Sequence, residues 1–183
     1  MIDNSRNYFL RWHIINRKYF SNIITNIFYY KPVILIAHNI RSLHNVGSLF
    51  RSADVFGIEK IFLTGFTGCP PRKEIHKTAL GSEFIIPWEF HGCVQEVIQS
   101  LKSKQYRVYG LETIAEATII KPQEHSEKLA LLIGNEVSGI EEDLFVLFDG
   151  CFVIPMIGRK KSLNVSIAAS IAMYVFQSKN MLN

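Results

Sequence analysis

From Pro32 onward, short apolar segments alternate with segments in which apolar residues recur at helical spacing. Short apolar runs bounded by turn residues are typical of strands buried on both faces, and a helix between two such strands lets them run parallel. The six runs that fit the strand pattern span residues 33–37, 60–63, 84–88, 107–111, 129–133 and 151–154. The chain is therefore predicted to have an α/β fold, a single domain built on one open, mostly parallel sheet.

Two of the intervening segments place apolar residues at i, i+3, i+4 and i+7, so each is predicted to form a helix with one buried face. These residues are Val46, Leu49, Phe50 and Ala53 in the first segment and Val94, Val97, Ile98 and Leu101 in the second. Residues 164–177 are predicted to form a closing helix. Its small residues are Val165, Ala168, Ala169, Ala172 and Val175. Such a stripe allows another helix to approach closely, either in the same chain or in a second subunit.

The composition is ordinary for a soluble globular domain, with 48% hydrophobic and 20% charged residues. The three cysteines, Cys69, Cys93 and Cys151, form no C-x-x-C pair, and the six histidines show no spacing typical of metal ligands. We therefore predict no metal site, no disulfide framework and a cytoplasmic location. No apolar run has the character of a transmembrane span or a secretory signal, which predicts no association with a membrane.

Common nucleotide-binding and hydrolase fingerprints are absent from the sequence. It has no G-x-x-x-x-G-K-[ST] loop, and no G-x-G-x-x-G follows the first predicted strand, which argues against a phosphate-loop NTPase. It also has no G-x-S-x-G turn, so a serine hydrolase is not supported. The remaining candidates for chemistry are polar residues that follow the predicted strands.

Residues 1–31 carry the excess positive charge of the chain. Five of the 20 basic residues but only one of the 16 acidic residues lie there, together with eight aromatic residues. Basic side chains bind the phosphate backbone and aromatic rings stack on unpaired bases, so this extension is predicted to contact RNA. The residues assigned to that contact are Arg6, Arg11, Arg17 and Lys18. The alternative is a helix whose aromatic side chains pack on the domain.

The first polar cluster opens the helical segment that follows the first predicted strand. Asn45 and Gly47 stand near the start of this segment, and Gly57 is placed to end it. Arg51 lies off the apolar face. Ligands of open α/β folds bind at the carboxyl ends of strands, so these residues are candidates for a site. The alternative for Arg51 is a solvated surface charge, as for most helical arginines.

Two further polar clusters follow later strands. Residues 134–139 read G-N-E-V-S-G, with Glu136 at the tip and two glycines that permit a tight turn or the close approach of a ligand. Residues 154–166 connect the last strand to the closing helix, where Ser162 or Asn164 can cap the helix. The alternatives are an ordinary turn and an ordinary strand–loop–helix connection.

Together, the three clusters resemble the motifs of the SpoU (TrmH-like) family of RNA 2′-O-ribose methyltransferases in the SPOUT superfamily. The motif N-x-G-x-x-x-R-[ST] is matched by residues 45–52 and G-x-E-x-x-G by residues 134–139. The motif I-P-M-x-G followed by S-L-N-x-S is matched by residues 154–166. The sequence matches the family motifs at every motif position. The resemblance covers about residues 33–177, so residues 1–31 lie outside it.

The resemblance implies a methyltransferase domain over residues 32–183 in which a deep trefoil knot is formed within about residues 129–178, a rare exception to un-knotted folds. Proteins of this kind bind S-adenosylmethionine in the knot loops. The residues that would surround the adenosine are Gly134, Ile154, Met156 and Leu163. Family members work as homodimers with the active site near the interface, so the expected partners are RNA and a second copy of the chain.

The reaction implied by the resemblance is the attack of a ribose 2′-hydroxyl on the methyl group of S-adenosylmethionine. The residues implied in catalysis are Arg51, Asn45, Glu136, Ser162 and Asn164. Arg51 has been cast as a base in this family, but removing a proton from an arginine at neutral pH costs roughly 8 kcal/mol. We therefore expect Arg51 to bind phosphate as a cation and to stabilise the developing alkoxide. Ser162 and Asn164 would then position the substrate, and Glu136 would orient Arg51 or the loop.

Two other functions remain open at the level of the sequence. One is a non-catalytic RNA-binding module of the same fold, and the other is a doubly wound domain that binds another nucleotide or small molecule. A non-catalytic module has no chemical need to keep the polar set together, which argues against the first; this set is Arg51, Glu136, Ser162 and Asn164. Binding of S-adenosylmethionine would exclude the second. The sequence does not distinguish transfer RNA from ribosomal RNA as the substrate.

Overall fold

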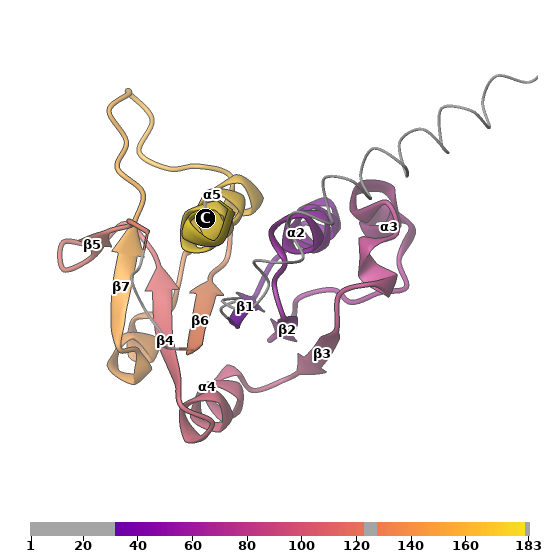
Figure 1. Cartoon of the computed structure of the whole chain (residues 1–183), viewed down its shortest axis with the longest axis horizontal. Coiled ribbons are helices and arrows are strands. Elements are labelled where there is room, and N and C mark those ends of the chain that lie inside the picture. The colour runs from indigo at the N-terminus through magenta and orange to yellow at the C-terminus, as the bar shows by residue number, and fades with distance from the viewer. Residues whose placement is uncertain (1–31, 123–127, 182–183) are drawn as a thin grey trace, which may run out of the picture. The chain divides into compact units, whose positions relative to one another are not determined.

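The computed structural model describes residues 32–122 and 128–181. These residues form one sheet of seven parallel strands. The strand order is β3-β2-β1-β6-β4-β7-β5 (Figure 1). The strands span Val33–His38 (β1), Lys60–Thr64 (β2), Trp88–His91 (β3), Tyr106–Leu111 (β4), Thr118–Ile119 (β5), Lys128–Ile133 (β6) and Gly150–Val153 (β7). The predicted open parallel sheet is confirmed. It has one more strand than expected, because β5 is too short to give a sequence pattern.

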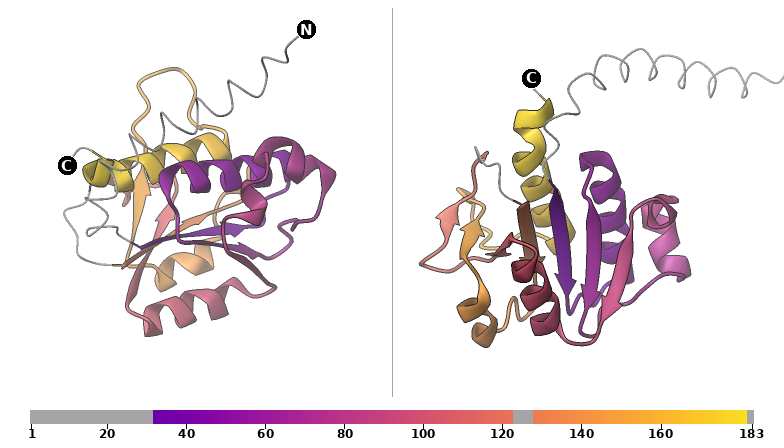
Figure 2. Two further views of the ribbon diagram at one scale, coloured as in Figure 1. Left: turned by 45° about the vertical axis from the view of Figure 1, so that its right-hand side comes forward. Right: turned by 60° about the horizontal axis from the view of Figure 1, so that its bottom comes forward.

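Helices cover both faces of this sheet (Figure 2). They are α2 (Leu43–Phe56), α3 (Lys73–Ala79), α4 (Val94–Ser103) and α5 (Val165–Met181), with short 3-10 helices η2 (Ser82–Phe84) and η3 (Glu142–Leu147). Alternate residues of β1 serve two cores: Leu35 belongs to the core under α2, α3 and α5, and Ile36 to the core under α4 and η3. Burial on both faces explains why β1 is a continuous apolar run.

The helix after β1 forms where the apolar spacing predicts it. The residues buried on its inner face are Val46, Gly47, Leu49, Phe50 and Ala53. The Ser42 hydroxyl accepts the Asn45 amide at 3.3 Å and caps the N-terminus, while Gly57 ends the helix with a φ of 63°. Asn45 therefore lies in the first turn of α2, at the edge of the sheet where the parallel strands end.

The prediction of a strand over residues 84–88 is wrong. The 3-10 helix η2 ends at Phe84, residues 85–87 are neither helix nor strand, and β3 begins at Trp88. Pro87 has no N–H to donate to a ladder, but its carbonyl accepts the Ile61 amide of β2 at 2.9 Å, which fixes the start of the strand. Phe84 and Ile85 are 76% and 66% exposed, and only Ile86 and Trp88 of this run pack in the core, so the run is not buried on both faces as a central strand would be.

The predicted closing helix is present as α5, and four of its five small residues pack in the core of the chain itself. Ala169 and Ala172 are fully buried, and Val165 and Val175 pack against the same core. The stripe therefore serves close packing within one chain, the first of the two alternatives. Replacing Ala172 by a larger residue would disrupt this core, so such a substitution would not test a subunit interface.

A second apolar stripe of α5 lies on the outer face of the helix. Ile167 and Tyr174 are 52% and 50% exposed, and they are separated by two helical turns. The neighbouring helix α2 contacts this region through the ring of Phe56, whose centroid lies 5.9 Å from that of Tyr174. Figure 1 shows α2 and α5 side by side on one face of the sheet. An exposed apolar stripe beside a second helix is typical of an interaction surface.

Among residues 32–122 and 128–181, none of the helices has the length and apolar character needed to cross a membrane. The same residues contain no group of three His, Cys, Asp or Glu side chains placed to hold a metal ion. The residues predicted to contact RNA in the N-terminal extension, Arg6, Arg11, Arg17 and Lys18, lie outside the described residues.

Candidate active site

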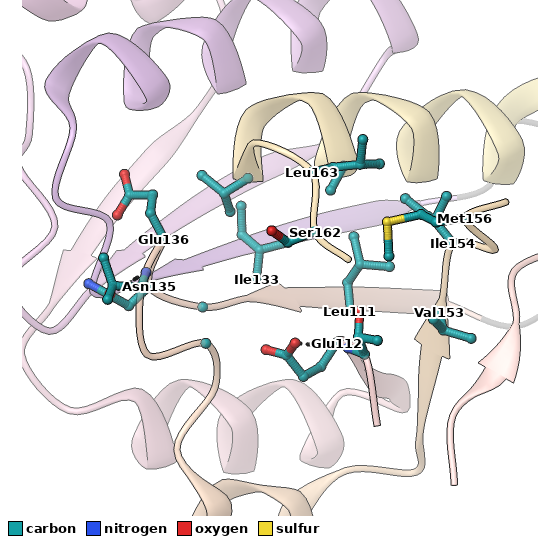
Figure 3. A pocket seen from close by; sticks show the side chains of 16 residues that line it. Leu111, Glu112, Ile133, Asn135, Glu136, Val153, Ile154, Met156, Ser162 and Leu163 are labelled. Atoms are coloured by element: carbon teal, nitrogen blue, oxygen red, sulfur yellow. Dashed lines mark hydrogen bonds between the residues drawn. The ribbon is translucent and has the colours of Figure 1, made fainter. Parts of the chain in front are cut away.

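A cavity of about 220 Å³ lies at the carboxyl ends of β4, β6 and β7, next to the start of α5 (Figure 3). Its apolar side chains are Leu111, Ile133, Val137, Val153, Ile154, Met156, Leu163, Val165 and Ala168. Its polar side chains are Glu112, Thr113, Asn135, Glu136 and Ser162, and Gly134 and Gly139 complete the wall. Apolar walls with a few polar groups suit a small ligand that has a flat apolar part.

The structure brings together the four residues that the motifs imply around the adenosine of S-adenosylmethionine. Gly134, Ile154, Met156 and Leu163 all line this cavity. They come from the loops after β6 and β7, whose carboxyl ends lie on the same edge of the sheet. Their contact with a cofactor stays a prediction.

Both glycines of the G-x-E-x-x-G motif occupy positions where an added Cβ would be strained. A Cβ on Gly134 would lie 2.4 Å from the Gly139 carbonyl oxygen, and a Cβ on Gly139 would lie 2.4 Å from Glu112 Oε2. Gly139 also has a φ of 71°, which favours glycine. The motif therefore forms a tight turn, and Asn135 and Gly139 pair their backbone groups at 3.0 Å in both directions.

Glu136 directs its carboxylate toward the start of α2. Oε2 accepts the Arg41 amide at 2.9 Å, and Oε1 accepts the Ser42 amide at 3.0 Å and Asn45 Nδ2 at 2.8 Å. Partial burial acts to raise the pKa of Glu136, but these three hydrogen bonds outweigh it and hold the pKa below its ordinary value. Glu136 is therefore ionised at neutral pH, and the geometry suits an orienting group better than a proton acceptor.

Asn45 links Glu136 to the loop that enters α5. Its Oδ1 accepts Asn164 Nδ2 at 3.2 Å. Asn164 Oδ1 in turn accepts the Ser166 amide at 2.9 Å and the Ser166 hydroxyl at 2.7 Å, so Asn164 caps α5. Of the two residues able to cap this helix, Asn164 does so, and Ser162 lines the cavity.

A second, open depression of about 430 Å³ adjoins the cavity. It is lined by Arg41, Ser42, Asn45, Glu136 and Asn164. Glu136 belongs to both hollows. A ligand in the depression would therefore lie next to a ligand in the cavity, which is the arrangement that a transfer reaction between two substrates requires.

Arg51 is not brought together with the other four predicted catalytic residues. It is exposed on α2 and lines neither the cavity nor the depression. It follows Asn45 by six residues, which is about 9 Å along a helix. Its neighbour Ser52 faces α5 instead, where the Ser52 and Ser170 hydroxyls lie 2.7 Å apart.

Sequence reasoning missed Glu112, which lines the cavity directly after β4. The signal that could have found it is its place, since it is a carboxylate at the carboxyl end of a predicted strand.

The loop after β1 was also missed as a part of the site. Asn39 adopts a φ of 56°, its carbonyl accepts Asn135 Nδ2 at 2.8 Å, and its Oδ1 accepts the Phe66 amide at 3.1 Å. These contacts tie the loops after β1, β2 and β6 together. They hold the Arg41 and Ser42 amides toward Glu136. No sequence pattern predicts this arrangement.

The chain is similar to known RNA-modifying enzymes along most of its length. It is 27% identical over 147 residues to tRNA (guanosine(18)-2′-O)-methyltransferase of Thermus thermophilus, which covers 80% of this chain and 75% of that protein. It is 28% identical to 23S rRNA (guanosine(2553)-2′-O)-methyltransferase RlmP of Bacillus subtilis, with 77% of this chain and 56% of that protein covered. The chain thus spans little more than half of the second relative.

Solved structures have the same fold. An AdoMet-bound rRNA methyltransferase from Sinorhizobium meliloti superposes with a TM-score of 0.73 at 26% identity, over 83% of this chain and 57% of that one. The A. aeolicus TrmH/SpoU tRNA modifying enzyme superposes with a TM-score of 0.74 at 24% identity, over 83% of this chain and 77% of that one.

The sequence signature of one family extends over all seven strands of the described sheet. The model of the SpoU rRNA Methylase family matches residues 32–174, from just before β1 into α5. That range includes all three polar clusters and every residue that lines the cavity. The chain therefore belongs to the SpoU rRNA Methylase family.

Proposed function

We propose that this protein transfers the methyl group of S-adenosylmethionine to a ribose 2′-hydroxyl of structured RNA. The observation that carries the proposal is that Gly134, Ile154, Met156 and Leu163 all line one cavity. This cavity adjoins a polar depression through Glu136. Two relatives are named for the methylation of guanosine in tRNA and in 23S rRNA, so either RNA class is a candidate substrate.

The residues of the cavity fit S-adenosylmethionine chemically. Leu111, Ile154 and Leu163 offer apolar surface to an adenine ring, and Gly134 lets the ligand approach the backbone. When bound, the cofactor supplies an electrophilic methyl group on a sulfonium ion. The two carboxylates of the lining suit a ligand that carries positive charge.

The polar depression would hold the ribose that is to be methylated. Asn45 and Asn164 offer amide groups for hydrogen bonds to a sugar. Glu136 holds the Asn45 side chain in place by accepting a hydrogen bond from its Nδ2. Alignment of the two reactants can supply several kcal/mol of the barrier reduction. The hydroxyl proton would leave to solvent through the open side of the depression, since Glu136 is already engaged by three donors.

Arg51 would act as a cation that binds a phosphate and stabilises the developing alkoxide. Within one chain it lies away from the cavity, so the proposed homodimer would place it near the site of the partner subunit. The exposed stripe beside it, Ile167 and Tyr174 on α5 with Val55 on α2, is the proposed subunit interface. This surface takes the place of the small-residue stripe as the candidate subunit interface, because the small-residue stripe is buried in the core.

A single charge in that stripe tests the dimer. Ile167→Asp is expected to convert a dimer to monomers, because an unpaired carboxylate in the centre of an apolar interface is costly to desolvate. Sedimentation velocity at micromolar concentration would measure the change, with Gln99→Asp on the opposite face of the sheet as the control. A wild-type protein that sediments as a monomer would refute the proposed dimer.

The N-terminal extension, residues 1–31, is proposed to contact RNA alongside a methyltransferase domain spanning residues 32–183. Replacing Arg6, Arg11, Arg17 and Lys18 by glutamine is expected to weaken RNA binding and to flatten its dependence on salt, because fewer counterions are released. Filter binding over a range of salt concentrations measures both effects, and calorimetry should show unchanged binding of S-adenosylmethionine. An unaltered salt slope would assign these residues to packing instead.

The finer architecture is also part of the proposal. β6 enters the sheet between β1 and β4, although β4 precedes it in the chain, and β7 then lies outside β4. This order supports a deep trefoil knot within about residues 129–178. Cellular RNA as the substrate would place the protein in the cytoplasm.

Calorimetry with S-adenosylmethionine is the first test of the function. Binding is expected, together with labelling of unmodified RNA by the methyl-labelled cofactor. Cofactor binding without transfer to any RNA would favour a non-catalytic RNA-binding module, and no binding at millimolar cofactor would contradict the proposed function.

A further inference from the structure

Glu112 places a carboxylate in the wall of the cavity. The residue follows β4, and Figure 3 shows its side chain extending toward the turn after β6. Oε1 accepts the Thr113 amide at 2.8 Å, and Oε2 accepts the Ile140 amide at 3.1 Å. An ionised carboxylate has about four acceptor positions, so two amide donors leave capacity for a ligand.

The geometry around Glu112 is specific. The absence of a Cβ on Gly139 makes room for Oε2, since that Cβ would lie 2.4 Å away. The Ile140 amide that Oε2 accepts belongs to the residue after this glycine. The turn of the G-x-E-x-x-G motif therefore holds the Glu112 carboxylate in place as well as shaping the cavity wall.

The charges that line the cavity are all negative. Among residues 32–122 and 128–181, the lining includes Glu112 and Glu136 and no lysine, arginine or histidine. Glu136 is engaged by Arg41, Ser42 and Asn45 and points toward α2, so Glu112 is the lining carboxylate with acceptor capacity left for a ligand in the cavity. The basic residues 159–161 lie in the loop between Met156 and Ser162 but are not part of the lining.

We propose that Glu112 makes the cavity select the positively charged methyl donor over the neutral-sulfur product. This inference rests on the proposed function. During transfer, the bond between the ribose oxygen and the methyl carbon forms, and the carbon–sulfur bond breaks with its electron pair going to sulfur. The sulfonium thereby becomes a thioether, and the ligand loses one positive charge. Glu112 attracts the donor and loses that attraction to S-adenosylhomocysteine, which favours release of the product.

The test is the ratio of two dissociation constants, measured by calorimetry for S-adenosylmethionine and S-adenosylhomocysteine. Glu112→Gln removes the charge and keeps the size of the side chain. Glu112→Asp keeps the charge. Glu116→Gln is the matched control, because it removes an exposed carboxylate of the same loop that does not line the cavity. Sinefungin, which carries an amino group where the sulfonium stands, is a third ligand.

The wild type is expected to prefer S-adenosylmethionine and sinefungin to S-adenosylhomocysteine, and Glu112→Gln should reduce that preference by about tenfold. Glu112→Asp and Glu116→Gln should retain it. A merely structural role for Glu112 would lower the affinity for all three ligands equally, and an unchanged ratio in Glu112→Gln would overturn the inference. A wild type that binds none of the three ligands would instead overturn the proposed function, and the inference with it.

Discussion

Arg51→Ala is expected to lower the rate of methyl transfer by about 100- to 1,000-fold, the size of effect seen when a group that stabilises developing charge is removed. The fold and the affinity for S-adenosylmethionine should stay nearly unchanged, because Arg51 is exposed on α2 and does not line the cavity. Single-turnover rates with saturating RNA measure the effect on chemistry. Arg72→Ala, which removes another exposed arginine, is the control.

Arg51→Lys separates the roles open to this side chain. Lysine restores the charge without the planar, two-pronged geometry of the guanidinium group. Substantial rescue would show that a point charge is sufficient, and failure would show that two-pronged binding matters. Wild-type transfer by Arg51→Ala would contradict the assignment of the motif, and Arg51 would then be a solvated surface charge.

Gly134→Ala is expected to destabilise the fold by about 2–3 kcal/mol and to weaken binding of S-adenosylmethionine by about 100-fold. The added Cβ would lie 2.4 Å from the Gly139 carbonyl oxygen, and that atom belongs to backbone that cannot move without opening the turn. The turn also positions Glu136 and the Ile140 amide, so its displacement should damage both hollows of the site. Thermal unfolding and calorimetry measure the two effects.

Gly158→Ala is the matched control for this substitution. Gly158 belongs to the loop after β7, yet a Cβ there would meet no atom within 4 Å. This variant should keep the stability and the cofactor affinity of the wild type. Wild-type affinity for S-adenosylmethionine in Gly134→Ala would contradict the placement of the cofactor in this cavity.

Much of the sheet could be predicted because burial on both faces leaves a continuous apolar run, as in β1 and β6. The same rule failed at residues 84–88, where Pro87 cannot donate to a ladder and the apolar side chains of Phe84 and Ile85 remain exposed. Apolar content alone does not reveal whether a run is covered. That depends on the elements that pack against it.

The candidate site was predictable where the motif residues lie in loops at the carboxyl ends of strands, as Gly134 and Met156 do. Two properties were not local to the sequence. The position of Arg51 depends on which face of α2 packs against α5, and the position of the Glu112 carboxylate depends on the amide of a residue 28 positions away. The outer stripe of α5 was missed for the same reason, since a sequence with apolar residues on two faces does not say which face is inside.

The most direct measurement is to incubate the protein with unmodified total RNA and S-adenosylmethionine labelled on its methyl group, and then to hydrolyse the RNA completely with alkali. Alkaline cleavage needs a free 2′-hydroxyl, so a 2′-O-methyl group protects the adjacent bond. The account predicts that the label appears in alkali-stable dinucleotides. Label in mononucleotides would mean methylation of a base, and that result, or the absence of label, would contradict the proposed 2′-O-methyltransferase activity.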